Sequence, residues 1–574
     1  MAVSQPLFGV WDYVVVAVVL LISSSIGIYY RFTGGKQKTV QEYLLADGNM
    51  AITPVAFSLM ASFMSAVTLL GVSSENYTYG FQFIVINLSY GIFTPVAAYL
   101  YLPVFFKLQA TSAYEYLELR FGKTSRLAAS LSYTLQITLY MGIVVYAPAL
   151  ALEALTGISK FLAILSIGLV CTFYSTIGGM KAVLMTDVFQ SLLMFAAVFS
   201  VIGSALVEKG SFSEIWRIAS EGGRTGLLNF DPDPTVRHTW LSLILGGGVT
   251  YLSLYAVNQI QVQRYLTVRS VKDAQTALWW SWPILSLLSV STAFAGLSIY
   301  AKYYNCDPVK ANFITSADQL MPYYVVDTMG FIPGLSGIFV AGIFSAALST
   351  VSAALNSLAA VTIEDYYKPL YRVIYKTDVP KESISLKTKI TALIYGLICM
   401  GVAFLAQFLG GLLEAALTIF GLVGGPLLGL FSLGMFTLTA NEVGSVTGLA
   451  FGVAMAGWMA FSPKPVTPAL PTSTDGCDIM FSNLTSDATV SALTQNDDDY
   501  FWLYRVSYLY NGVAGLVVTL VVGYVTSIVT RKISGRRVED EKYDPYLFVP
   551  PLAKRMLENE KNNLAPEPPT DIKY

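Results

Sequence analysis

The stretch "FSLMASFMSAVTLLGVSSENYTYG", residues 57–80, is long and apolar enough to cross a membrane, yet a hydroxyl or a glycine recurs every few residues. These positions are Ser58, Ser62, Ser65, Thr68, Gly71, Ser73 and Ser74. Polar groups are costly in hydrocarbon, so the pattern indicates a function. A helix that breaks inside the membrane frees backbone carbonyls, which can bind ions. We therefore predict a discontinuous helix in this stretch.

A second polar stretch, "FSAALSTVSAALNS", contains neither a charge nor a proline. Its polar residues recur at intervals of four, three and four, which places them on one helix face: Ser345, Ser349, Ser352 and Asn356. Close packing through small residues would explain any single serine. The adjacent hydroxyls of Ser349 and Thr350 also suit a hard monovalent cation, because such ions prefer oxygen ligands. We interpret the stripe as half of a cation site whose partner carbonyls come from a broken helix.

The composition places the chain in the membrane class. Of its 574 residues, 54% are hydrophobic and 13% are charged, whereas soluble domains carry about 25% charged residues. The single histidine, His238, excludes zinc motifs that need two, and no nucleophile–base or metal-binding set occurs within the apolar segments. The net charge of −2 gives no reason to expect nucleic-acid binding. We predict an all-α polytopic membrane protein that is not an enzyme.

Thirteen segments qualify as membrane spans, and the topology follows from the basic residues between them. The segments are 10–31, 51–74, 80–106, 128–152, 159–180, 185–207, 239–263, 275–303, 331–361, 387–408, 411–436, 441–461 and 506–530. The basic residues that fall on one side are Arg31, Lys36, Lys38, Lys107, Arg120, Lys123, Arg126, Lys181, Arg264, Arg269, Lys272, Lys368, Arg372, Lys376, Lys381, Lys387, Arg531, Lys532, Arg536 and Arg537. Since basic loops are cytosolic, we expect an extracellular N-terminus and a cytosolic C-terminus. The N-terminal apolar run lacks a preceding basic region, so it is expected to be a span and not a cleaved signal.

Two interrupted spans indicate an internal repeat. The seventh span contains "LGGGVTYLSLYAVNQIQVQ", 245–263, and its three consecutive glycines favour local unwinding. It lies five spans after the first interrupted one, as expected for an inverted repeat of spans two to six against seven to eleven. The chain then divides into 1–50 (N-terminus, first span and cytosolic loop), 51–238 (first repeat and following extracellular loop), 239–440 (second repeat), 441–530 (last two spans with extracellular loop 462–505) and 531–574. The charged, proline-containing segment 531–574 is expected to be a flexible cytosolic tail.

Two features of the expected extracellular loops agree with this topology. "NLT" at 483–485 makes Asn483 a candidate glycosylation site. Cys306 and Cys477 also fall in outside loops, where a disulfide can persist, and we expect them to pair. The alternative is two free thiols.

Two further positions leave alternatives open. Asp187, in "TDVFQ", lies at the expected cytosolic start of the sixth span. It either caps that helix or attracts the cation on its inward route. The stretch "GLVGGPLLGLF", 421–431, contains four glycines and a proline, which indicate either close packing with a kink or a flexible outer gate.

Several long motifs occur in the order seen in the sodium:solute symporter family, and over roughly residues 10–530 the chain resembles it. The motifs are "SLMASFMSAVTLLG", "GGMKAVLMTDVFQ", "VNQIQVQRYL", "DQLMPY", "FSAALSTVSAALNSLAAVTIEDYYKP" and "QFLGGLLEAALTIFGLVGGPLLGLFSLGMF". The branch that it resembles contains the sodium-coupled monocarboxylate, multivitamin and iodide transporters. The resemblance implies thirteen spans with a five-plus-five, LeuT-like inverted repeat containing discontinuous helices.

The resemblance also implies site residues. The sodium ligands would come from Ala61, Met64, Ala346, Ser349 and Thr350. Asp187 would lie on the inward exit route of the ion. The substrate pocket would lie beside Ser65, Thr68, Tyr251, Tyr255 and Asn258.

The resemblance implies a plasma-membrane symporter that imports a small organic anion with co-transported sodium. "SFMSAVT" is most similar to the monocarboxylate transporters. The alternatives are a multivitamin (biotin or pantothenate) carrier, an iodide-type carrier, or a channel or nutrient sensor on the same fold. Glu414 departs from the glutamine common in relatives, and an added negative charge at a pocket entrance would disfavour anions. The expected partners are the lipid bilayer and the small anion, with neither nucleic acid nor an obligate protein partner.

Overall fold

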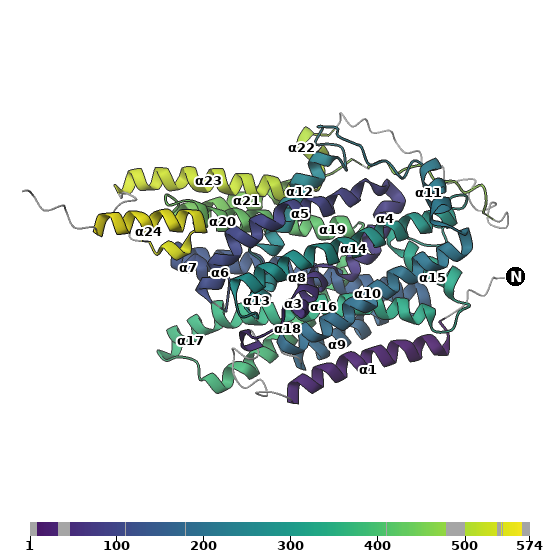
Figure 1. Ribbon diagram of the computed structural model, residues 1–574, viewed down its shortest axis with the longest axis horizontal. Coiled ribbons are helices and arrows are strands. Elements are labelled where there is room, and N and C mark those ends of the chain that lie inside the picture. The colour runs from purple at the N-terminus through teal and green to yellow at the C-terminus, as the bar shows by residue number, and fades with distance from the viewer. Residues whose placement is uncertain are drawn as a thin grey trace, which may run out of the picture.

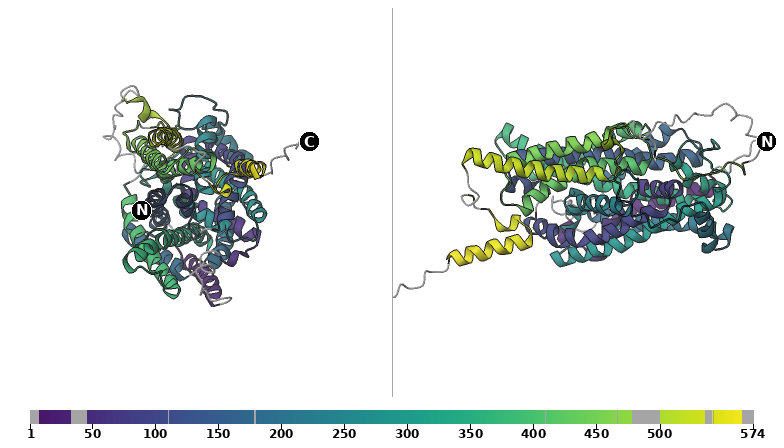
Figure 2. Two further views of the ribbon diagram at one scale, coloured as in Figure 1. Left: turned by 90° about the vertical axis from the view of Figure 1, so that its left-hand side faces the viewer. Right: turned by 90° about the horizontal axis from the view of Figure 1, so that it is seen from above.

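The computed structural model describes residues 8–32, 46–109, 111–177, 180–408, 410–465, 467–477, 500–535, 541 and 543–564. Throughout this part of the chain every regular element is helical, which confirms the all-α expectation. The long helices run along the longest axis of the molecule (Figure 1) and are seen end on in the left view of Figure 2.

The long helical segments are α1 (Val10–Phe32), α3 (Ile52–Phe63) with α4 (Ala66–Tyr79), η2 (Phe81–Val85) continuing through α5 (Ile86–Val96), η3 (Ala97–Tyr101) and α6 (Leu102–Leu108), α8 (Lys123–Thr156), α10 (Met180–Lys209), α12 (Trp240–Tyr255) with α13 (Gln259–Tyr265), α14 (Val271–Tyr303), α16 (Leu335–Val361), α18 (Lys381–Ala406), α19 (Leu412–Ile419) continuing through η6 (Phe420–Gly424) and α20 (Gly425–Phe436), α21 (Glu442–Phe461) and α23 (Tyr510–Ser534). The shorter elements are η1 (Ala46–Gly48), α7 (Glu115–Arg120), α9 (Lys160–Ile177), α11 (Phe212–Glu221), η4 (Ala317–Gln319), α15 (Leu320–Met329), η5 (Thr362–Tyr367), α17 (Lys368–Tyr375), α22 (Trp502–Arg505), η10 (Pro545–Leu547) and α24 (Pro550–Leu564).

The structure does not confirm the expected count of thirteen spans. Among the described residues, ten helices are long and apolar enough to cross a membrane, and two bent helix pairs bring the number to twelve. The expected span 159–180 corresponds to α9, whose apolar stretch, Lys160–Phe173, is shorter than the roughly 20 residues that a crossing needs.

The first expected break is confirmed. α3 and α4 meet at an angle of 60°. Met64 and Ser65, which join them, both have extended backbones. Ser65 occupies the position before the first residue of α4, where serine is favoured. The last carbonyls of α3 therefore lack the helical partners that an unbroken span would supply.

The second break is also present, but the glycines do not make it. α12 and α13 meet at 58°, with the break after Tyr255 and not at the three glycines. A Cβ at Gly246 would lie 2.5 Å from the Leu509 carbonyl oxygen, and one at Gly248 would lie 2.2 Å from the Phe93 ring. The glycines thus allow close packing within an unbroken helix. Asn258 begins α13 by accepting a hydrogen bond from the Ile260 N–H at 2.9 Å.

The glycine-rich stretch 421–431 also packs closely. A Cβ at Gly425 would lie 2.1 Å from the carbonyl oxygen of Gly512 on α23. The chain here forms a π-helical turn, η6, before α20 continues the segment. This contact supports the close-packing interpretation of the stretch.

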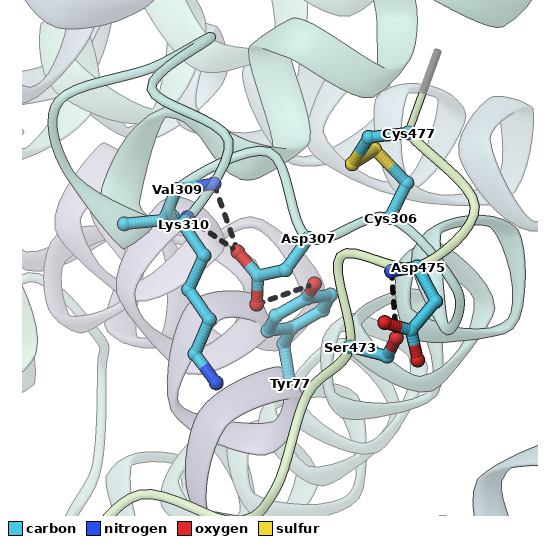
Figure 3. The surroundings of a disulfide bond; sticks show 8 residues. All are labelled: Tyr77, Cys306, Asp307, Val309, Lys310, Ser473, Asp475 and Cys477. Atoms are coloured by element: carbon cyan, nitrogen blue, oxygen red, sulfur yellow. Dashed lines mark hydrogen bonds between the residues drawn. A yellow bond between two sulfur atoms is a disulfide. The ribbon is translucent and has the colours of Figure 1, made fainter. Parts of the chain in front are cut away.

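Cys306 and Cys477 form the expected disulfide, with their Cα atoms 5.0 Å apart. Figure 3 shows the neighbouring Asp307, whose carboxylate accepts hydrogen bonds from the Tyr77 hydroxyl at 3.2 Å and the Val309 N–H at 2.8 Å. The bond therefore ties the segment after α21 to the region between α14 and α15. We call this end of the bundle, where α11 and α15 lie in Figure 1, the disulfide end, and the opposite end, with α7, α17 and α24, the tail end.

Removing this disulfide is expected to lower the thermal unfolding temperature of the purified protein. The bond closes a separation of 171 residues, and restricting so long a loop stabilises a fold by up to about 5 kcal/mol. Cys306→Ser, Cys477→Ser and the double variant should lose the same amount, because each removes the same bond. Cys399→Ala, which alters a buried cysteine outside any disulfide, is the control. Additive losses in the double variant would contradict the pairing.

The C-terminal tail is not flexible throughout, contrary to expectation. Leu547, Phe548 and Val549 are buried. The Tyr116 hydroxyl donates to the Leu547 carbonyl at 3.0 Å, and the Val549 N–H donates to the Met435 carbonyl at 3.1 Å. The tail thus packs on α7 and the end of α20, which bury its three apolar residues. The composition of the tail does not show that this surface exists.

Candidate ion and substrate site

The hydroxyl stripe of α16 faces the first broken helix. Thr350 Oγ1 lies 3.4 Å from the Ala61 carbonyl oxygen on α3 and 3.1 Å from the Ala346 carbonyl oxygen on its own helix. All three residues are buried. Met64, three residues after Ala61, directly follows the last residue of α3. The structure therefore brings expected sodium ligands from two distant segments together at the break.

Ser349 points to a carboxylate. Its hydroxyl donates a hydrogen bond of 2.6 Å to Asp187 Oδ1. This directs the hydroxyl proton to Asp187 and leaves lone pairs of Ser349 Oγ free to bind a cation. Asp187 lies about two turns inside α10, which begins at Met180, and it is fully buried. The interpretation of Asp187 as a helix cap is therefore wrong.

A buried arginine completes the surroundings of Asp187. Arg264 Nη2 lies 3.4 Å from Asp187 Oδ2, and the Ser58 hydroxyl donates to the same carboxylate oxygen. Arg264 Nε donates in turn to Ser58 Oγ at 2.7 Å. This ion pair links α3, α10 and α13 around Ser349.

Arg264 is the functional residue that sequence reasoning misplaced. The predicted topology places Arg264 in a cytosolic loop, whereas in the structure it is buried within α13. The signal was its position inside the polar run "VNQIQVQRYL", next to the second broken span. A charge inside a membrane segment needs a partner, and Asp187 supplies it.

Two small cavities lie beside the break. The larger, here called the central cavity, is lined by residues that include Met64, Thr68, Val72, Tyr140, Leu413 and Phe420. The second is lined by residues that include Ser62, Phe63, Tyr140, Asn258, Gln261 and Phe420. Of the expected substrate residues, Thr68 thus borders the central cavity and Asn258 the second.

The other three expected substrate residues support these walls. Ser65 Oγ accepts a hydrogen bond from the Tyr140 hydroxyl at 3.1 Å. Tyr251 and Tyr255 stack with ring centroids 4.5 Å apart, and the Tyr255 hydroxyl donates to the Leu59 carbonyl at 3.0 Å. Tyr255 thus holds α12 against α3, whereas the Tyr251 hydroxyl lies 2.9 Å from Thr94 Oγ1 on α5. Neither tyrosine borders either cavity.

The chemistry of the cavity walls is neutral. Gln261, which sequence reasoning missed, donates from Nε2 to the Leu59 carbonyl at 3.2 Å and to Ser62 Oγ at 3.1 Å. Within the described residues, neither cavity is lined by lysine or arginine. The cavity walls therefore present hydroxyl, phenol and amide groups, close to the neutral oxygens of Ala61, Ala346 and Thr350.

Comparison with known proteins agrees with this arrangement. Residues 43–452 match the Sodium:solute symporter family. The chain belongs to this family. A putative sodium-dependent multivitamin transporter of Drosophila melanogaster is 55% identical over 560 residues, covering 96% of this chain and 92% of the relative. The human sodium-coupled monocarboxylate transporter 1 is 44% identical over 541 residues, covering 91% and 88%.

Solved structures confirm the expected transporter fold. A Na⁺-coupled sialic acid symporter, in a substrate-bound outward-open state, superposes with a TM-score of 0.74 at 25% identity, covering 91% of this chain and 98% of that one. The nucleobase-cation symporter Mhp1 has a TM-score of 0.51 at 14% identity, covering 86% and 95%, and shows the fold alone. The chain is thus a LeuT-like, multi-span membrane transporter that couples solute movement to sodium.

Proposed function

We propose that this transporter imports a small monocarboxylate anion with sodium across the plasma membrane. The observation that carries the proposal is the contact of Thr350 Oγ1 with the Ala61 carbonyl, immediately before the break that leads to Ser65 and Thr68. The same broken helix thus borders both the ion site and the central cavity. Binding at either the ion site or the cavity therefore alters the conformation of the helix that also forms the other site, which is the physical basis of coupling.

In this proposal the sodium ligands are the carbonyl oxygens of Ala61, Met64 and Ala346 and the hydroxyls of Ser349 and Thr350. Sodium binds first and holds α3 against α16, which shapes the substrate cavity. Asp187 lies beside Ser349, so its charge favours the ion as it leaves inward. The membrane potential drives this inward step by about 2.3 kcal/mol per charge per 100 mV.

The cavities favour a small carboxylate. Their linings are largely aromatic and aliphatic, and their neutral polar residues are Ser62, Thr68, Tyr90, Tyr140, Asn258, Gln261 and Ser289. Of these, Ser62, Tyr140 and Gln261 already donate hydrogen bonds within the protein. A carboxylate with few further polar groups matches so few donors, because polar groups left unpaired would disfavour binding. The human monocarboxylate relative supports this class of solute. The 55% identity to the putative multivitamin transporter favours a second candidate, a vitamin carboxylate such as biotin or pantothenate.

Uptake of labelled pyruvate, lactate, biotin, pantothenate, iodide and glucose tests both candidates. Cells that express the protein are compared with matched control cells, in sodium and in choline. We expect saturable, sodium-dependent accumulation of pyruvate and lactate. Uptake of biotin or pantothenate alone would replace the first candidate by the second. Solute-induced currents without accumulation would favour a channel or sensor.

The proposed topology places the disulfide end outside the cell. Asp12, in the first turn of α1, accepts a hydrogen bond at 2.9 Å from the Gly337 N–H in the first turn of α16, the helix that follows α15. The start of α1 and the tail therefore lie at opposite ends of the bundle (Figure 1). In this proposal α9 counts as a short thirteenth crossing, because an odd number leaves the two ends on opposite sides of the membrane. A disulfide at the α1 end supports an extracellular position for that end, because disulfides persist in oxidising compartments.

Glycosylation tests this orientation. Asn483 lies outside the described residues, in the segment that follows Cys477. We expect Asn483→Gln to increase the gel mobility of the protein to that of enzymatically deglycosylated wild type. Asn87→Gln, which removes a sequon inside α5, should leave the mobility unchanged. Unaltered mobility of both variants, with an unglycosylated wild type, would contradict the orientation.

A further inference from the structure

An arginine bridges two acidic residues at the disulfide end. Arg237 precedes α12, Glu75 belongs to α4, and Glu414 to the first turn of α19. Arg237 Nε and Nη2 donate to the two carboxylate oxygens of Glu75 at 2.7 and 3.1 Å. Its third nitrogen, Nη1, donates to Glu414 Oε2 at 3.0 Å. We call these three residues the Arg237 clamp.

The clamp lies directly over the central cavity. Val72 and Leu413 line the cavity. Glu75 lies one helical turn beyond Val72, and Glu414 directly follows Leu413. α4 and α19 touch beneath the clamp, since a Cβ at Gly71 would lie 2.8 Å from Leu413 Cβ. A solute that enters from this end must therefore separate α4 from α19.

The two acidic partners of Arg237 differ in how firmly they are held. Glu75 makes two hydrogen bonds to the guanidinium, and its side chain is 7% exposed. Glu414 makes one, and its side chain is 36% exposed. A buried bidentate pair is hard to break, whereas a half-exposed single contact contributes little. If α4 and α19 separated, the contact of Arg237 with Glu414 would therefore break before its contact with Glu75.

The guanidinium is the positive charge that bridges Glu75 and Glu414, and the Lys464 ammonium is close enough to interact electrostatically with Glu414. Burial lowers the pKa of Arg237, but Glu75, Tyr508 and Glu414 together outweigh that effect and raise the pKa above its ordinary value. His238 is neutral, because burial and the Arg237 charge hold its pKa well below the usual range. The rings of Tyr79 and Tyr508 lie 4.1 and 4.9 Å from the guanidinium and help to shield it from water.

We propose that Glu414 is a displaceable counter-ion, and that the carboxylate of an incoming solute replaces it on Arg237 as α19 separates from α4. Arg237 is then the first recognition residue for the anion, and the solute moves from it to the neutral cavity below. The exchange swaps one carboxylate for another, so Arg237 keeps its carboxylate partners, and the released Glu414, whose side chain is 36% exposed, is solvated by water. It rests on the proposed import of a carboxylate. Glu414 thus competes with the solute carboxylate for Arg237.

Two measurements on Glu414→Gln test this exchange. The first is the rate at which a membrane-impermeant thiol reagent labels Val72→Cys, a cavity position beneath the clamp, in sodium without solute. The second is the KM for the transported carboxylate. We expect Glu414→Gln to speed labelling and to lower KM by about two- to fivefold each, the scale of one half-exposed ion pair. Glu414→Asp, which keeps the charge, is the matched control and should stay close to wild type.

Arg237→Lys provides a second variant if Glu414→Gln fails to reach the surface. A lysine keeps the charge but cannot form the planar, two-sided contact, so labelling should also become faster. Labelling does not depend on the identity of the solute, so it tests the clamp even if the uptake panel disproves monocarboxylate import. Unchanged labelling and KM in Glu414→Gln would overturn the inference while leaving the transport proposal intact. Faster labelling with a raised KM would overturn the exchange of carboxylates.

Discussion

Replacing Thr350 with alanine is expected to raise the sodium concentration for half-maximal uptake by about tenfold or more. The hydroxyl is the group of α16 that reaches the Ala61 carbonyl across the break. Contacts between a neutral polar group and a charge contribute about 1.5–3 kcal/mol, which corresponds to a factor of roughly 10 to 100 in affinity. Ser349→Ala should act in the same direction, because it also removes an oxygen from the proposed ligand set.

Uptake measured against sodium concentration, with choline as the replacement cation, distinguishes this effect from a general loss of folding. Ser352→Ala is the matched control on the same helix, since the Ser352 hydroxyl donates only to the Ser349 carbonyl among its described contacts. Its half-saturating sodium concentration should stay near that of wild type. A Thr350→Ala variant that loses maximal rate but keeps its sodium dependence would contradict the proposed site. Solute affinity independent of sodium in Ser349→Ala and wild type alike would contradict the proposed order of binding.

The first break could be predicted because its chemistry is local. Hydroxyls at Ser62, Ser65 and Thr68 are hard to explain in a simple membrane helix, and the structure ends α3 at Phe63. The second break was expected at the wrong place. Three glycines can indicate either unwinding or close helix contact, and the choice depends on neighbours such as Leu509 and Phe93, which are distant in sequence.

The pairing of Asp187 with Arg264 could not be derived from the sequence for the same reason. The two residues are separated by 77 positions and lie on different helices. Arg264 directly follows the predicted span 239–263 and therefore resembles the basic residues that flank membrane spans. The disulfide could be predicted from the sequence, because the expected topology places only two of the four cysteines in loops on the same side of the membrane. The partners of the charged residues thus depend on tertiary contacts, which the sequence does not show. The first broken helix could be predicted because it depends on local composition.

Neutralising one member of the buried Asp187–Arg264 pair is expected to be far more damaging than neutralising both. Asp187→Asn leaves the guanidinium of Arg264 without its counter-charge in a fully buried position. Loss of one partner from such a pair costs about 3–5 kcal/mol, because the remaining charge stays desolvated. Arg264→Gln should be equally harmful for the opposite charge. Both single variants should show reduced surface abundance and a lower unfolding temperature.

The double variant, Asp187→Asn with Arg264→Gln, separates the structural role of the pair from its role in coupling. It removes both charges, so surface abundance and unfolding temperature should recover in a double-mutant cycle. Sodium-coupled uptake should not recover, because Ser349 then lacks the carboxylate that orients its hydroxyl. Arg217→Gln on α11 breaks an exposed ion pair with Glu214 and should change stability by less than about 1 kcal/mol. Recovery of normal uptake in the double variant would show that the charge of Asp187 has no part in moving the ion.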